Sequence, residues 1–303
     1  MNIYVVIVTY NPKKWIDQCF LSLRSSTVAV KTIVIDNGST DGSQDVIIKH
    51  YPEVEFIQSS INLGFGKANN IGIKKAYDAG TDFVFLLNQD AWIEPDTIDK
   101  LVVAAKKNPE FGLISPIHLN GKGTDLDFNF SKYLSPNDSP SFISDAFLGK
   151  VHNNLYKIKF VNAAAWLLTR KCIETVGGFN PLFDMYGEDN NYLQRIFYHD
   201  FHIGVLANVR IYHDRDVREK SNYLIDESKI FRRNLLIKYC NPANKHSIIE
   251  EISWRKKIMI RELLKCHLSN YKKLREEIKM INPITSEVES TKNVSKRKGL
   301  SFL

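Results

Sequence analysis

The chain is poor in cysteine and has no long apolar run, and both absences narrow the classes of protein to consider. Its 303 residues include only four cysteines, which are Cys19, Cys172, Cys240 and Cys266. Their wide spacing excludes a CxxC metal site and a dense disulfide framework, and it predicts a reducing compartment. No run approaches the roughly 20 apolar residues that a membrane-spanning helix needs, and no basic leader precedes the first apolar run. We therefore expect a cytoplasmic globular protein.

Two phosphate-binding signatures are also missing. The chain contains neither GxGxxG nor a Walker P-loop, which disfavours a Rossmann dehydrogenase and a P-loop phosphotransferase. Residues 1–252 also lack any excess of positive charge, since they hold 28 Lys and Arg against 29 Asp and Glu. The whole excess lies in residues 253–303, with 13 Lys and Arg against 5 Asp and Glu. We therefore expect no nucleic-acid partner and a separate basic surface near the C-terminal end.

What the first half does contain is an alternation of strands and helices. Strand-like runs occupy 3–8, 31–36, 54–58 and 83–87, and helical patterns lie at about 13–24, 42–50, 66–78 and 95–107. Such alternation predicts βαβ units with right-handed crossovers and a mostly parallel sheet. The fold class is therefore α/β, a nucleotide-binding sheet flanked by helices.

The second half is less regular. We expect strands at 112–117, 157–161, 203–206 and 209–212, and helices near 170–177 and 188–200. The polar stretch 119–150 between them is interpreted as a surface excursion that serves as a lid or acceptor loop. One domain would then cover 1–215, with a nucleotide-binding half (1–118) and an acceptor half (119–215). A helical region (216–282) and a disordered polar tail (283–303) would follow.

Small polar residues follow the strands of the first half. The three relevant strand ends are Thr9-Tyr10-Asn11, Asp36-Asn37-Gly38 and Asn88-Gln89-Asp90. Because the carboxyl ends of parallel strands meet in one crevice, these residues predict a site for a polar, phosphorylated ligand. The helix that begins near Gly66 offers further N–H groups to an anion. Asp90 is a candidate ligand for a hard cation, and oxygen donors suit Mg²⁺ or Mn²⁺.

Several acidic residues and one histidine admit two interpretations. Asp36 could shape the turn that follows it or accept a hydrogen bond from the N–H of a pyrimidine ring, and we favour the second. Asp41 is interpreted as a helix cap. The pair Glu188-Asp189 could simply cap a helix, although neighbouring like charges separate two pKa values and allow one carboxylate to act as a general base. His213, taken alone, indicates only a satisfied side chain.

The order of the motifs resembles a known family. The motifs are VTYNP (8–12), IDNGSTDGS (35–43), NLGFGKANNIGI (62–73), LLNQDAWIEPD (86–96), GGFNPLFDMYGEDNNYLQR (177–195) and YHD (212–214). Together they are similar to family-2 glycosyltransferases of GT-A fold, and most similar to bacterial rhamnosyltransferase-like enzymes that build surface polysaccharides. The resemblance covers about residues 1–215.

The resemblance implies an activity and a donor site. Members transfer a sugar from a nucleoside-diphosphate donor to an acceptor hydroxyl with inversion, using Mg²⁺ or Mn²⁺. By similarity, Thr9, Tyr10 and Asn11 would border the nucleotide. Asp36 would contact uracil or thymine, and Asn69 would help to close the pocket.

The resemblance also assigns the reacting centre. Asn88-Gln89-Asp90 occupies the place of the family's DxD, so Asp90 would hold the metal and Asn88 would lie near the ribose. Asp189 matches the catalytic base, Glu188 would lie beside the acceptor, and His213 matches a histidine that completes the metal shell in some members. Asparagine at 88 removes one negative charge from the expected motif, so Asp90, His213 and the donor diphosphate would hold the ion.

The acceptor is less defined. We expect residues 119–166 to select it, with Asn162 and Trp166 as candidate contacts, although Trp166 could equally belong to the core. A glycan or a lipid-linked oligosaccharide fits the family, and the donor could be a UDP-hexose or dTDP-rhamnose. A nucleotidyltransferase and a non-catalytic nucleotide-sugar-binding module are the alternative functions.

The basic tail also admits two interpretations. Residues 253–281 carry nine Lys and Arg against three Asp and Glu, with apolar residues at helical spacing. A helix over this stretch could pack on its own domain or a partner, or lie on an anionic membrane surface. The second case would place the protein peripherally on the inner face of the plasma membrane.

Overall fold

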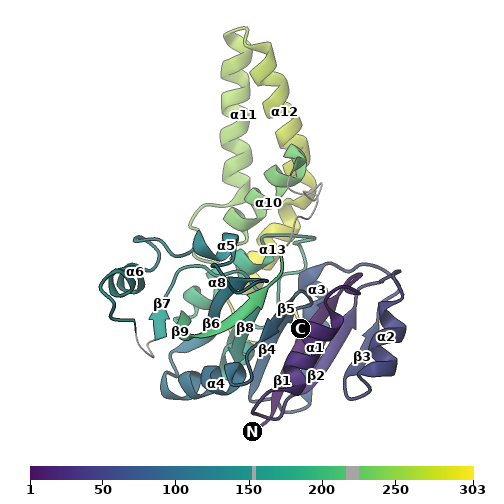
Figure 1. The fold of residues 1–303 in the computed structure, drawn as a ribbon. Helices are drawn as coiled ribbons and strands as arrows, with labels where there is room; N and C mark the ends of the chain where they lie inside the picture. Colours follow the sequence, from purple (N-terminus) through teal and green to yellow (C-terminus); the bar gives the residue numbers. More distant parts are fainter. Residues whose placement is uncertain (152–154, 216–224) are drawn as a thin grey trace.

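The computed structural model describes residues 1–151, 155–215 and 225–303, and a mixed sheet forms its centre (Figure 1). The strands are β1 (Ile3–Thr9), β2 (Lys31–Asp36), β3 (Glu55–Gln58), β4 (Phe83–Asn88), β5 (Ala91–Ile93), β6 (Phe111–Asn120), β7 (Leu155–Lys157), β8 (Ala165–Thr169) and β9 (His202–His213). Their order across the sheet is β3-β2-β1-β4-β8-β6-β9-β5, and β7 pairs with β9. The helices that surround the sheet are α1 (Ile16–Arg24), α2 (Ser43–His50), α3 (Phe65–Asp78), α4 (Thr97–Lys107), α5 (Phe128–Ser131), α6 (Pro140–Phe147), α7 (Arg170–Val176) and α8 (Glu188–Tyr198).

The first half confirms the predicted α/β arrangement. Strands β3, β2, β1 and β4 are parallel neighbours. In their register Thr9 lies beside Asp36 and Val8 beside Asn88, so three strands end at the same level. The sequence predicts a ligand crevice at this edge of the sheet, where the carboxyl ends of the three strands meet.

Successive side chains of the strands enter two separate cores. In β1, Ile7 belongs to the core that includes residues of α1, α2 and α4, whereas its neighbour Val6 belongs to the core that includes residues of α3, α7 and α8. This alternation follows from the two-residue period of a strand. Both faces of the parallel strands are therefore covered, as continuous apolar runs in a parallel sheet require.

The second half differs from the expected order of strands. The unexpected strand β8 runs antiparallel between β4 and β6; its short apolar run does not by itself distinguish a strand from a buried helix. The two expected strands at 203–212 are one strand, β9, which is irregular opposite Pro116 and Ile117. The excursion after β6 includes α5 and α6. Antiparallel pairing of β5 with β9 brings Ala91 beside His213.

The C-terminal helices form a unit of their own. They are α10 (Glu227–Tyr239), α11 (Ile248–Leu264), α12 (Leu268–Ile281), η1 (Asn282–Ile284) and α13 (Thr285–Ser295). The expected single helix over 253–281 is instead a hairpin of α11 and α12 that projects from the part of the molecule that contains the sheet (Figure 1). Cys266, with φ +59°, lies between the two helices. Residues 216–224, where the helical region was expected to begin, lie outside the described residues.

The prediction of a disordered tail from residue 283 is wrong. Helix α13 buries Val288 completely in a third core that includes Phe183, Leu236 and Ile281. His199 Nε2 lies 3.0 Å from the carbonyl oxygen of Ser295. The polar composition of the segment concealed a few apolar residues that complete this small core, so it is ordered by tertiary contacts rather than by its own propensity.

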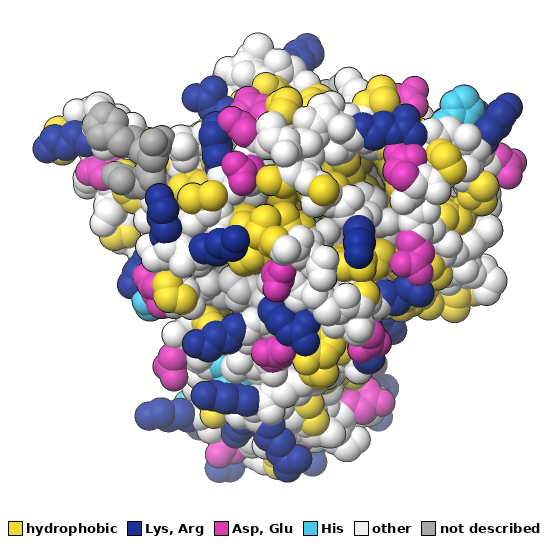
Figure 2. All heavy atoms as spheres, turned by 90° about the horizontal axis from the view of Figure 1, so that it is seen from below, with side chains coloured by type: hydrophobic (Ala, Val, Ile, Leu, Met, Phe, Trp, Pro, Cys, Tyr) yellow, Lys and Arg dark blue, Asp and Glu magenta, His cyan; other side chains and the backbone are white. Residues whose placement is uncertain are grey.

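On the face seen from below, basic and acidic side chains are interspersed (Figure 2). No helix in the described part of the chain is both long enough and apolar enough to cross a membrane.

Candidate active site

A cavity of about 430 Å³ opens at the edge of the sheet where β1, β2 and β4 end. Among its lining residues are Tyr10, Asn11, Asn37, Asn88, Gln89 and Asp90. These residues come from the ends of β1, β2 and β4, so the structure brings together most of the strand-end residues that the sequence singles out. Amide, hydroxyl and carboxylate groups thus converge on a cavity whose remaining lining is largely apolar, a combination typical of ligand pockets.

Asp90, which lines this cavity, lies next to a buried imidazole. Asp90 Oδ2 lies 3.4 Å from His213 Nε2, and both side chains are at most 3% exposed. The Asn88 amide nitrogen lies 3.5 Å from the same imidazole nitrogen. Two ligands on adjacent corners of an Mg²⁺ or Mn²⁺ octahedron stand about 3 Å apart, because each ligand lies roughly 2.1 Å from the ion. The Asp90–His213 pair therefore fits a shared divalent cation.

The described residues supply few ligands for such an ion. They contain no cluster of three or more His, Cys, Asp or Glu suited to hold a metal. An ion at Asp90 and His213 would need oxygen ligands from water and from a bound diphosphate. This shortage of protein ligands agrees with the sequence, in which Asn88 replaces one carboxylate of the DxD motif.

Asp36 lies beneath the cavity rather than in its lining. Its carboxylate is fully buried and accepts hydrogen bonds from the Thr9 hydroxyl at 2.9 Å and from the Ser39 backbone N–H at 3.0 Å. It also accepts one from the Ser39 hydroxyl. In this structure Asp36 shapes the turn after β2, while its neighbour Asn37 lines the cavity. A contact between Asp36 and a nucleotide base stays a prediction.

Gln89 holds the loop after β1 in place. Its side-chain oxygen accepts from the Tyr10 backbone N–H at 2.6 Å, and its side-chain nitrogen donates to the Tyr10 carbonyl at 3.0 Å. Asn11 adopts φ +50° and accepts from the Thr40 N–H at 2.8 Å. The middle residue of the triplet thus positions the predicted nucleotide loop, a role that the sequence did not reveal.

Asn69 is buried on α3. Its amide nitrogen donates to the Phe65 carbonyl at 3.0 Å, within the first turn of that helix. Phe65 and Gly64 line the cavity, whereas Asn69 stands behind them. Its predicted part in closing the nucleotide pocket is therefore indirect in this structure.

Glu188 and Asp189 begin α8, immediately after Gly187 in left-handed conformation. Burial, and then the charge of Asp189, raises the pKa of Glu188. Burial also raises the pKa of Asp189, although the N–H of Asn190 and the charges of Arg215 and Arg233 oppose this. Two adjacent buried carboxyls with raised pKa values oppose each other's ionisation, so one can stay protonated while the other serves as a general base. An ionised carboxylate on a helix N-terminus is the form that a general base needs.

Of the two candidate acceptor contacts, one is excluded. Trp166 is fully buried and packs against Phe179 and Tyr192, with ring centroids 5.9 and 5.7 Å away. The prediction that Trp166 contacts an acceptor is therefore wrong, because it occupies the inward face of the unexpected strand β8. Asn162 is 9% exposed, and its side-chain oxygen has no hydrogen-bond partner among the described residues.

Three charged residues near the cation pair were not predicted. Asp214 accepts from the Trp15 indole at 2.7 Å and from the Lys14 ammonium at 2.9 Å, which ties β9 to α1. Arg215 forms an ion pair with Asp127, whose carboxylate oxygen lies 2.8 Å from Arg215 Nε. Asp214 lies within the YHD motif, but no sequence pattern links residues 127 and 215.

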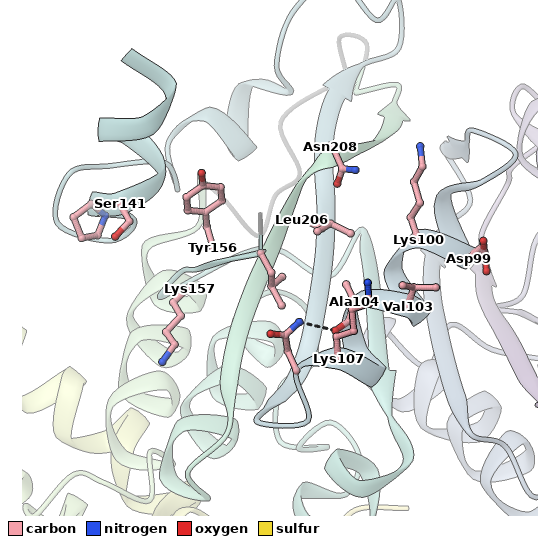
Figure 3. A pocket seen from close by; sticks show the side chains of 13 residues that line it. Asp99, Lys100, Val103, Ala104, Lys107, Ser141, Tyr156, Lys157, Leu206 and Asn208 are labelled. Atoms are coloured by element: carbon pink, nitrogen blue, oxygen red, sulfur yellow. Dashed lines mark hydrogen bonds between the residues drawn. The ribbon is translucent and has the colours of Figure 1, made fainter. Parts of the chain in front are cut away.

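A second cavity, of about 1000 Å³, lies away from these residues (Figure 3). It is bordered by α4, α6 and β7, and lysines 100, 107 and 157 are among its lining residues. Lys100 is paired with Asp96 at 2.6 Å, and Lys157 Nζ lies 2.7 Å from His202 Nε2. None of the predicted site residues lines this cavity, so it is not the candidate active site.

The parallel first half of the sheet and the carboxylate–histidine pair formed by Asp90 and His213 resemble features of a GT-A glycosyltransferase. The chain belongs to glycosyl transferase family 2, whose sequence model matches residues 4–177. A relative is the N-acetylglucosaminyl-diphospho-decaprenol L-rhamnosyltransferase of Mycobacterium tuberculosis. It is 30% identical over 212 residues, which are 61% of this chain and 67% of that protein.

Solved structures share the fold. S. aureus TarS 1-349 in complex with UDP-GlcNAc superposes with a TM-score of 0.59 at 13% identity, covering 98% of this chain and 90% of that one. GalNAc-T7 with UDP, GalNAc and Mn²⁺ gives 0.58 at 15% identity, covering 78% and 48%. These similarities confirm the predicted GT-A arrangement, and the family confirms a glycosyltransferase.

Proposed function

We propose that the protein transfers a sugar from a nucleoside-diphosphate sugar to a hydroxyl group, with inversion and with the help of Mg²⁺ or Mn²⁺. The observation that carries this proposal is the buried contact between His213 and Asp90, the latter lining the cavity at the ends of β1, β2 and β4. The Glu188–Asp189 pair supplies a base of raised pKa in the same domain.

The acceptor step is assigned to Asp189. Its carboxylate takes the proton of the acceptor hydroxyl while that oxygen attacks the anomeric carbon, and the bond to the diphosphate breaks on the opposite face. Burial disfavours the charge of Glu188 and raises its pKa, so we assign it the protonated role in the pair. It can therefore donate a hydrogen bond to the acceptor without competing as a base.

The donor is held by residues from three strand ends. Asp90 and His213 would hold the cation, which stabilises the charge of the departing diphosphate when it is bound. Thr9, Tyr10, Asn11 and Asn88 would border the nucleotide, and the base would lie at the end of β2 beside Asp36. A UDP-hexose and dTDP-rhamnose both suit this arrangement. UDP-GlcNAc is bound by the related fold of TarS, and rhamnose transfer is named for the mycobacterial relative.

The acceptor is proposed to be a glycan or a lipid-linked saccharide of surface polysaccharide synthesis. The name of the mycobacterial relative describes a diphospho-decaprenol acceptor, which is such a lipid. The hairpin of α11 and α12 fits this setting. It exposes Leu263, Leu264 and Leu268 near its turn, between helices that carry a surplus of Lys and Arg. We propose that this turn rests on an anionic membrane surface and holds the protein at the inner face.

A panel of nucleotide sugars, with and without Mn²⁺, tests the function. A transferase releases free nucleoside diphosphate from one donor, and it does so only with the cation. Release of pyrophosphate instead would indicate a nucleotidyltransferase. Donor binding without release, even in the presence of acceptor glycans, would indicate a binding module and overturn the proposal.

A further inference from the structure

The buried carboxylate of Asp127 connects the acceptor half of the domain to the cation pair. Asp127 lies in the excursion after β6, where its backbone N–H donates to the His118 carbonyl at 2.8 Å. Its side chain is 1% exposed. The two carboxylate oxygens have different partners, and each set of partners belongs to a different part of the molecule.

One oxygen caps a helix of the acceptor half. Asp127 Oδ1 accepts from the backbone N–H groups of Asn129 and Phe130 at 3.0 and 2.8 Å, at the start of α5. Aspartate is among the residues preferred at this position, and asparagine and serine can replace it as a cap. The cap therefore needs an oxygen acceptor but no charge.

The other oxygen faces the histidine of the cation pair. Asp127 Oδ2 lies 2.8 Å from Arg215 Nε and 3.6 Å from His213 Nδ1. Arg215 Nε also donates to His213 Nδ1 at 3.3 Å. The Nδ1 atom therefore has one neighbour that can only donate and one that can only accept.

These two neighbours favour opposite tautomers of the neutral imidazole. If Arg215 donates to Nδ1, the ring proton is on Nε2 and faces Asp90, so Nε2 has no lone pair for a cation. If Nδ1 carries the proton and donates it to Asp127, the Nε2 lone pair is free. A histidine that binds a metal through one nitrogen commonly donates the other N–H to a carboxylate, which fixes the ring in the binding tautomer.

We propose that Asp127 is a positioning residue that holds His213 in the tautomer required for cation binding. This inference rests on the proposed function, since it assigns His213 to the cation. The same carboxylate caps α5, so this side chain contacts both the acceptor half and the histidine of the cation pair.

The substitution Asp127→Asn tests this role. Asparagine can still cap α5 with its oxygen, but it then turns an N–H donor toward Nδ1 and keeps the ring proton on Nε2. Mn²⁺ affinity is measured by electron paramagnetic resonance in the presence of UDP and, separately, dTDP. We expect about a 10- to 100-fold weaker affinity, with little change in the melting temperature. Asp125→Asn, an exposed carboxylate two residues away, should bind Mn²⁺ like the wild type.

Each outcome decides a separate question. Equal Mn²⁺ affinity for the wild type and Asp127→Asn would overturn the positioning role and leave the proposed function intact. A wild type that binds no Mn²⁺ with either nucleotide would overturn the cation site and this inference with it. If Asp127→Asn does not fold, Asp127→Ser keeps a cap and withdraws the carboxylate, and it must show the same loss of affinity for the inference to stand.

Discussion

At the scale of single residues, burial raises the pKa of both carboxyls that begin α8, and Asp189 is the proposed base of the two. Replacing Asp189 with Asn keeps the shape of the side chain but removes the proton acceptor. We expect kcat to fall by about 10²- to 10⁴-fold, while donor affinity stays nearly unchanged because the donor site lies at the strand ends. Single-turnover transfer and nucleotide titration measure the two quantities. Lost donor affinity with unchanged kcat would remove Asp189 from the base role.

The same pair predicts a dependence of stability on pH. The pKa of Glu188 is raised in the folded chain, so folding favours the protonated form. This contribution to stability is fully present below the ordinary glutamate pKa and is lost as pH rises through the raised pKa. We expect Glu188→Gln to lose less stability between pH 5 and pH 9 than the wild type does, because Asp189 is then the only carboxyl of the pair that still titrates with a raised pKa. Parallel curves for the two proteins would contradict this.

The departure from DxD predicts unequal roles for its two ends. Asp90→Ala should lower metal-dependent kcat/KM by more than about 100-fold, because a bound cation stabilises the departing charge by several kcal/mol. Asn88→Ala should be milder, since the Asn88 amide only approaches His213 at 3.5 Å. Initial rates over a Mn²⁺ titration give both values. If Asp90→Ala keeps full metal-dependent activity, the cation assignment fails.

Sequence reasoning located the residues at strand ends better than those in the excursion. Asp90 and Asn88 follow a buried apolar run, and parallel strands must end at one edge, so their place in the crevice was predictable. The contact between Asp127 and His213 depends on how the excursion folds back after β6. No local pattern encodes that path, and Asp127 resembles any other helix cap in the sequence.

At the scale of elements, the hairpin of α11 and α12 exposes apolar side chains beside its turn, whereas a helix packed along its whole length would bury them. Leu264 and Leu268 are 79% and 57% exposed beside its turn. Replacing both with Glu should weaken co-sedimentation with phosphatidylglycerol vesicles by more than tenfold, because it removes apolar contact and adds repulsion by the anionic surface. Ile48→Glu on α2, where Ile48 is 54% exposed, serves as the control and should change nothing. Undiminished binding of the Glu variant would exclude the turn as the membrane contact.

The elements also show where the spacing of apolar residues is sufficient to predict a helix or strand and where it is not. The helices of the first half match their predicted ranges because each has one apolar stripe. The stripe over 253–281 continues through the turn at Cys266, so spacing alone did not indicate a hairpin. Strand β8 lies within a short apolar run, and only its antiparallel partners β4 and β6 identify it as a strand.

At the scale of the whole molecule, the C-terminal segment closes back onto the catalytic unit. The Gly178 N–H donates to the Ser301 carbonyl at 2.8 Å, and the Asn70 amide donates to the Phe302 carbonyl at 3.0 Å. Asn70 also holds Phe179 through its backbone N–H and carbonyl. The segment therefore buttresses the turn that leads toward α8 and its two carboxyls.

A pair of glycine substitutions tests this closure. Gly177 and Gly80 both have positive φ, +77° and +76°, so alanine introduces backbone strain at either position, and the ψ of −147° at Gly177 adds to that strain. A Cβ at Gly177 would collide with the backbone of Ser301, whereas one at Gly80 meets nothing within 4 Å. We expect Gly177→Ala to lower the free energy of unfolding by about 1–3 kcal/mol more than Gly80→Ala does, and to lower kcat as well, because the start of α8 shifts. Urea unfolding and transfer rates of both variants supply the comparison. Equal losses would show that the C-terminal segment lies on the catalytic unit without supporting it.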